Sequence, residues 1–153
     1  VFLPLVPLLT RLSKLLVPGD DPISADKANV KLSDKLLDTP VLAVDEIDRT
    51  VVRMADYTRS TVTRSFEHFF EGRPKADEIL TMESRVDEMQ SAITVYATKL
   101  FSRDLSDELS LRLPVLLHSI NDLERISDNA VNVVETRERI EGKLQSVDPS
   151  LLE

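Results

Sequence analysis

The chain of 153 residues is long enough for one domain with a core of useful size, and 42% of its residues are hydrophobic. Its formal net charge of -8 argues against a nucleic-acid partner, because phosphate binding needs a concentrated basic surface. The chain has no cysteine, which excludes disulfides, zinc knuckles and thiol catalysis, so any metal must be held mainly by oxygen ligands. It also has no Gly-rich loop and none of the common catalytic patterns, and we expect no enzyme activity.

The N-terminal run VFLPLVPLL is entirely apolar and ends at Thr10 and Arg11. A membrane-spanning helix needs roughly 20 apolar residues, so this run is too short by itself. Three interpretations remain: the end of a membrane helix that begins outside this chain, an amphipathic helix in the membrane interface, or a leucine stripe that covers the chain's own core. We expect residues 1–18 to contact a membrane, with the flank at Arg11 and Lys14 in the cytoplasm, and residues 19–38 to form a linker.

A long helix is predicted to follow. Thr39 is a probable N-cap, Pro40 suits the first helical turn, and Gly72 with Pro74 is a stop signal. Apolar and small side chains recur between these signals at every third or fourth position. They are Val44, Ile47, Val51, Met54, Thr58, Val62, Ser65 and Phe69.

Two more helices are predicted, one from about Pro74 to Ser102 and one from Ser106, a candidate N-cap, towards Gly142. Pro114 should kink the third helix or delay its regular start. No strand-like alternation competes, so the sequence predicts an all-α fold, an antiparallel three-helix bundle over residues 39–145, with a flexible tail at 146–153. Helices this long leave much elongated surface exposed, and we expect a homodimer or another helical self-association.

Two pairs of acidic residues lie beside the apolar stripes. Glu83 and Asp87 are four residues apart in the second helix, and Glu124 and Asp128 repeat this spacing in the third. Neighbouring helices would bring these four carboxylates together, an arrangement that bundle proteins use for multinuclear metal sites. Oxygen ligands favour magnesium, manganese or iron. Acid pairs at this spacing are, however, no more frequent here than chance gives, so spacing alone fits a solvated surface equally well.

Neither histidine is expected to join the carboxylates. His118 points away from the edge that carries Glu124 and Asp128 on a helical wheel, and His68 lies near the end of the first helix, where positive charge is favoured. We predict that both are solvated or cap a helix end. The absence of Glu-x-x-His spacing argues against a carboxylate-bridged metalloenzyme.

The segment DLERISDNAVNVVE resembles the D-L-E-R-I-G-D-x-A-x-N signature of PhoU-like domains, which regulate phosphate uptake, and MESRVDEMQSAITVY resembles the E-x-x-x-D helix that accompanies it. KLLDTPVLAVDEIDRTVVRM is similar to the segment that joins the membrane and PhoU-like parts of bacterial sodium/phosphate cotransporters of the type II-related family. VFLPLVPLLTRLSKLLVPGDDP is similar to the end of their last membrane helix. These matches occur in the order of the family.

The resemblance implies a PhoU-like half unit on the cytoplasmic face of a bacterial inner (plasma) membrane, partnered with the membrane domain of the same transporter. Its function would be to regulate sodium-dependent phosphate uptake; the alternatives are a purely structural dimerisation scaffold or a metal-binding bundle. Because the PhoU family proper binds multinuclear metal clusters through E/D-x-x-x-D motifs, the resemblance makes the two acid pairs candidate ligands for iron, zinc, manganese or magnesium. Asp122 and Arg125 complete the signature, and Ser127 stands where the family has glycine.

Overall fold

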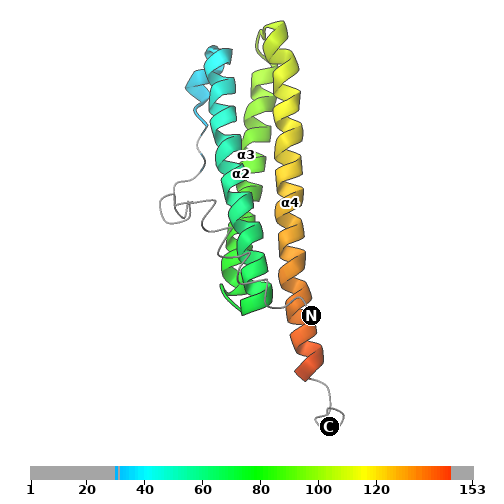
Figure 1. The fold of residues 1–153 in the computed structure, drawn as a ribbon. Coiled ribbons are helices and arrows are strands. Elements are labelled where there is room, and N and C mark those ends of the chain that lie inside the picture. The colour runs from blue at the N-terminus through cyan, green and yellow to red at the C-terminus, as the bar shows by residue number, and fades with distance from the viewer. Residues whose placement is uncertain (1–29, 31, 146–153) are drawn as a thin grey trace, which may run out of the picture.

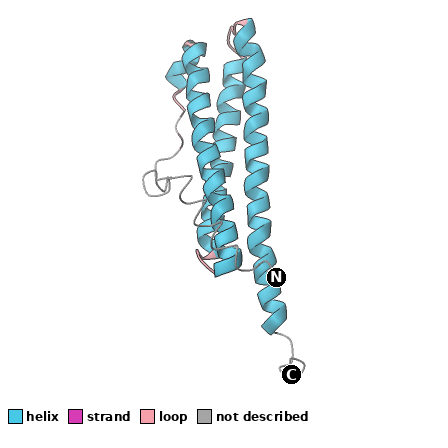
Figure 2. Ribbon diagram, in the orientation of Figure 1, coloured by secondary structure: helices cyan, strands magenta, loops and turns pink. Residues whose placement is uncertain are grey.

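The structure is a computed structural model that describes residue 30 and residues 32–145. Its elements, in chain order, are the 3-10 helix η3 (Asp34–Asp38) and the α-helices α2 (Pro40–Glu71), α3 (Ala76–Phe101) and α4 (Asp107–Gln145). The three long helices run antiparallel, and α4 continues past the ends of α2 and α3 (Figure 1). The predicted three-helix all-α bundle is confirmed, and Figure 2 shows only helices and loops in the described part of the chain. The predictions for residues 1–18 and 146–153 lie outside the described residues.

Helix α2 begins and ends where its sequence signals predict. Pro40 occupies the first turn, although the side chain of Thr39 makes no capping hydrogen bond. Gly72 ends the helix with φ of 72°, the left-handed conformation that glycine adopts without steric cost, and its N–H donates to the carbonyl of His68 at 2.9 Å. A Cβ at Gly72 would lie 3.1 Å from a guanidinium nitrogen of Arg137 on α4. This end of α2 is therefore fitted closely against α4.

Helix α4 starts after Ser106, whose hydroxyl accepts a long hydrogen bond of 3.4 Å from the N–H of Leu109. The expectation that Pro114 delays the regular start of this helix is wrong, because the helix begins at Asp107 and continues through the proline without a break. Proline removes one backbone donor, which leaves the carbonyl of Ser110 without its helical partner. Both residues are exposed, so water can hydrate that carbonyl at little cost.

The core lies along the axis where the three apolar stripes meet. All three helices contribute side chains with no exposed surface, and full burial of such a side chain stabilises the fold by about 1.5–3 kcal/mol. They include Val44, Ile47, Met54, Val86, Ile93, Leu100, Leu113 and Ile120.

Residues 34–38, expected to be the end of a linker, instead form η3 and pack on the bundle. Leu37 is buried, and the Lys99 ammonium binds the Asp34 carboxylate at 2.9 Å. The Tyr96 hydroxyl donates to the carbonyl of Ser33 at 2.9 Å. The linker expectation missed this segment because a single apolar turn has no periodicity to reveal it.

A seam of polar side chains is buried between α2 and the other two helices. Thr58 and Ser65, predicted to face the core, are buried, and so are Thr50, Thr61 and His68. The threonine and serine hydroxyls mostly satisfy themselves within their own helix; Thr61, for example, donates to the carbonyl of Tyr57 at 2.9 Å. Small polar side chains allow the helices to approach without leaving their hydroxyls unpaired.

His68 was predicted to be solvated or to cap a helix end, and the first alternative is wrong, because its side chain is only 8% exposed. Its Nδ1 lies 2.7 Å from the carbonyl of Pro74, so Nδ1 carries the proton and donates it. Nε2 is buried and has no partner within the described part of the chain. The histidine thus ties the end of α2 to the segment that enters α3. His118 is exposed, as predicted.

None of the helices in the described residues is long and apolar enough to cross a membrane.

Candidate functional site

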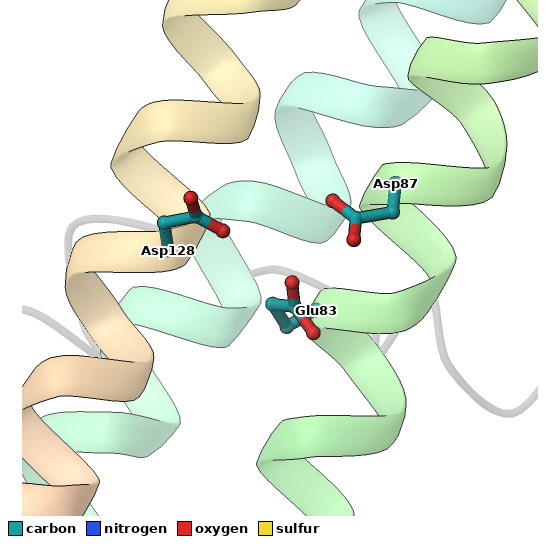
Figure 3. Close-up of side chains that lie close together, drawn as sticks. All are labelled: Glu83, Asp87 and Asp128. Carbon is teal, nitrogen blue, oxygen red and sulfur yellow. The ribbon is translucent and has the colours of Figure 1, made fainter.

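Three of the four predicted carboxylates meet between α3 and α4. Glu83 and Asp87 project from α3 and Asp128 projects from α4, and one oxygen of each lies within 4.8 Å of the other two. Figure 3 shows the three carboxylates turned toward one another in the space between the two helices. We call these three residues the acidic cluster. The cluster is open to solvent, since both aspartates are exposed and only Glu83 is partly covered.

The local sequence explains why these acids lie at the edge of the interface. On α3, Met82 and Val86 are buried, so the residues that follow each of them, Glu83 and Asp87, lie at the margin of the packed face. On α4, Ser127 is fully buried, and Asp128 is the next residue. Both helices therefore present their acids along the same edge of the α3–α4 interface.

A hydrogen bond fixes the register of the two helices beside the acidic cluster. The amide of Gln90 on α3 donates to the side-chain oxygen of Asn121 on α4 at 3.0 Å. Because the helices are antiparallel, the step of seven residues from Gln90 back to Glu83 matches the step of seven from Asn121 forward to Asp128. The step of three residues back to Asp87 likewise matches the step of three forward to Glu124. This bond holds the acids at the same level.

The electrostatics of the acidic cluster are those of like charges held close together. The pKa of Glu83 is raised from 4.5 to about 7, first by burial and then by the charge and hydrogen bond of Asp87 and those of Asp128. Near neutral pH, therefore, Glu83 keeps its proton far more often than an isolated carboxyl does, and it can donate this proton to an aspartate. A bound cation would displace this proton.

The carboxylate of Glu124, the fourth predicted ligand, does not lie within 4.8 Å of all three members of the acidic cluster. It is close enough, however, for Asp128 and Asp87 to affect its pKa. Burial raises its pKa first, the charges of Asp128 and Asp87 raise it further, and Arg125 opposes them. The structure therefore groups three predicted residues tightly and places Glu124 next to them.

The nearby arginine on α3 does not neutralise the acidic cluster. Arg85 pairs with Glu88 at 2.5 Å, and every contribution to the Glu83 pKa raises it. Asp122, part of the sequence signature, is exposed. Closely spaced oxygen ligands with unneutralised charge suit hard divalent cations such as Mg²⁺ and Mn²⁺, and iron also binds such sites. The residues present thus fit a metal ion by their chemistry.

The fold and this site define a class of protein, an elongated antiparallel three-helix bundle with a cluster of carboxylates on the open α3–α4 flank. The family model of the PhoU domain matches residues 51–136, more than half of the 153 residues. The chain belongs to the PhoU domain family. This family consists of regulatory helical domains and is not known for enzymes, which gives the chain a phosphate-related regulatory role. The match contains the whole of α3 and both acid pairs.

No curated protein matches the chain, and no solved structure does.

Sequence reasoning did not find that Ser127 and His68 are buried. Ser127 is fully buried, and its hydroxyl has no hydrogen-bond partner in the described part of the chain. A signal was present, because Ser127 stands midway between the buried Ile120 and Val134 at steps of seven residues. His68 likewise continues the spacing of the buried Thr61 and Ser65.

Proposed function

We propose that this bundle is the cytoplasmic regulatory domain of a sodium-dependent phosphate transporter in a bacterial inner membrane, where it modulates phosphate uptake. The observation that carries the proposal is the PhoU domain match over residues 51–136. The resemblance of the segments before it to the connecting and membrane parts of such transporters supports the more specific assignment.

The acidic cluster is the proposed point of regulation. Glu83, Asp87 and Asp128 would hold a divalent cation, with Glu124 as an adjacent ligand. The cation would supply positive charge that cancels the repulsion among these acids and links α3 to α4. Without it, Glu83 keeps a proton in part of the population near neutral pH, and that proton bridges the same two helices. The state of the cluster therefore bears on the stiffness of the α3–α4 flank.

A bundle of this kind can shift a transporter between states only if it contacts those states differently. The flank formed by α3 and α4 is the surface whose charge changes most with occupancy of the acidic cluster, because it carries all four acids. We therefore assign the state-dependent contact with the membrane domain to this flank.

The test compares phosphate uptake, over a range of external phosphate, between the complete transporter and one that lacks residues 39–145. We expect uptake to lose its dependence on phosphate supply. Unchanged uptake and unchanged regulation would contradict the proposal.

A second comparison separates the acidic cluster from the rest of the bundle. Glu83→Gln with Asp128→Asn should alter regulation as the deletion does. Glu88→Gln is the matched control, because Glu88 lies on the same helix but pairs with Arg85. If all these variants regulate normally while the deletion does not, the bundle acts without the cluster, as a scaffold would.

A further inference from the structure

The flank formed by α2 and α4 carries an exposed apolar surface near the end of α2. Five of its side chains are large and at least 45% exposed, and two more are partly buried beside them. We call this surface the phenylalanine patch. It consists of Phe66, Phe69 and Phe70 on α2 and Ile126, Val133, Ile140 and Leu144 on α4.

The aromatic part of the patch is ordered and hollowed. The rings of Phe66 and Phe70 stack with centroids 6.5 Å apart, and Phe69 meets Phe70 edge to face at 5.2 Å. These rings and the neighbouring part of α4 around Val133 line a hollow of about 310 Å³. Rings that pack against one another while facing water form a ready surface for an apolar side chain from outside.

The helical part of the patch has the spacing of a helix–helix contact. Ile126, Val133 and Ile140 are separated by steps of seven residues, so they form one line about 21 Å long on α4. The line is symmetric, because Val133 has an isoleucine seven residues before it and another seven residues after it. If a second α4 crosses antiparallel at Val133, Ile126 of each copy therefore lies against Ile140 of the other. Such self-complementarity is what a two-fold dimer requires.

The exposed area agrees with a stable interface. From the exposed fractions, the patch offers roughly 600 Å² of apolar surface, at the upper limit of about 300–600 Å² for the largest patch on a typical monomer. A standard interface buries about 800 Å² on each partner, so the patch supplies most of the area that such an interface needs. Because apolar surface is unfavourable in water, an uncovered patch of this size favours association.

Two other occupants fit less well. An anionic lipid surface attracts a basic rim, but the chain has a net charge of -8 and Arg137, beside the patch, is paired with Glu141 at 2.5 Å. The described residues just before α2 pack elsewhere, because Val30 lines a hollow along α3 and η3 contacts α2 and α3 but not α4.

We propose that the phenylalanine patch is the interface of a homodimer in which α4 crosses α4 of a second copy antiparallel near Val133. Ile140 of each copy would then lie opposite Ile126 of the other, and the two aromatic hollows, which lie beside Val133, would flank the crossing. Asp128 follows Ile126 by two residues, about 200° around the helix, so the acidic cluster stays open on the opposite flank. The interface is independent of metal binding and of the transporter assignment.

Sedimentation equilibrium on the full chain tests the interface. The unaltered chain should be a dimer at micromolar concentration. The double variant Phe70→Glu with Ile126→Glu should weaken association at least 100-fold. Val95→Glu, at an exposed valine on α3, is the matched control and should remain dimeric. Circular dichroism checks that each variant stays helical. A folded double variant that still dimerises, or an unaltered chain that is monomeric, overturns the proposal.

Cysteine cross-linking tests the direction of the crossing. Because the chain has no native cysteine, any disulfide must form at the introduced residue. Val133→Cys should form a disulfide-linked dimer with itself. Ile126→Cys should not, but it should link to Ile140→Cys when the two variants are mixed. A parallel crossing predicts the reverse, namely self-linking of Ile126→Cys and no mixed product, and that result refutes the arrangement. Val95→Cys should remain unlinked, and linking there would show that the reaction reports random collision.

Discussion

Replacing Glu83 with glutamine changes how the stability of the metal-free bundle depends on pH. The pKa of Glu83 is raised from 4.5 to about 7 by burial and by Asp87 and Asp128. The folded protein therefore binds this proton more tightly than the unfolded chain does. The stability that the proton contributes is complete below about pH 4.5 and is lost as the pH rises through 7. Glutamine resembles the protonated acid and keeps its hydrogen bond at every pH, so the variant should lack this loss.

The size of the effect follows from the shift. Each tenfold change in an acid constant corresponds to about 1.4 kcal/mol, so the pKa shift sets an upper limit of about 3 kcal/mol. The cluster is open to water, which screens its charges, and we expect about 1–2 kcal/mol. At pH 8 the free energy of unfolding of Glu83→Gln should exceed that of the unaltered protein by this amount, and at pH 4.5 the two should be nearly equal.

Urea denaturation in the presence of a chelator, at intervals from pH 4.5 to 8, measures this difference. Glu88→Gln is the control, because Glu88 pairs with Arg85 and should show the pH dependence of the unaltered protein. If Glu83→Gln and the unaltered protein lose stability in parallel between pH 5 and 8, the raised pKa of Glu83 is refuted, and with it the close packing of the three carboxylates.

Three further predictions concern single side chains and the cation. Ser127→Ala should be neutral or stabilise the fold by about 1 kcal/mol in urea denaturation, because the buried hydroxyl has no partner in the described structure; a clear loss would show that a buried water satisfies it. Arg137→Ala should destabilise the fold by about 2 kcal/mol and lower the melting temperature, because its guanidinium donates to the carbonyls of His68 and Phe69 at the end of α2; an unchanged melting temperature would contradict this role. Manganese or magnesium at 100 times its dissociation constant should stabilise the unaltered protein by about 2.7 kcal/mol and leave Asp128→Asn unaffected, while an equal rise in both would show binding elsewhere.

The sequence by itself determined the elements and their faces. The spacing of apolar residues, the helix caps and the stop signals are local features of a sequence. They therefore sufficed to predict the start of α2 at Pro40, its C-cap at Gly72 and the burial of Thr58 and Ser65. The prediction that Pro114 delays the start of α4 was wrong, because the carbonyl that the proline leaves without a donor is exposed and can be hydrated. Likewise, η3 has too few residues to show a period.

Tertiary structure decided which acids meet. Glu67 and Glu71 have the same four-residue spacing as Glu83 and Asp87, and nothing in spacing distinguishes the two pairs. The difference arises from the register of α3 against α4, in which Asp128 comes within reach of the α3 pair. Register depends on the summed packing of two helices, which no short stretch of sequence contains.

Burial of polar groups was also decided only in three dimensions. His68 was predicted to be solvated or to cap a helix end, because positive charge is favoured there, but the turn after Gly72 folds back and brings the carbonyl of Pro74 to its ring at 2.7 Å. The pKa of Glu83 is raised to about 7 because burial removes water from its carboxyl and because Asp87 and, from another helix, Asp128 place negative charge beside it. A sequence specifies which side chains a helix presents, whereas their electrostatic environment is set by what the other helices place opposite them.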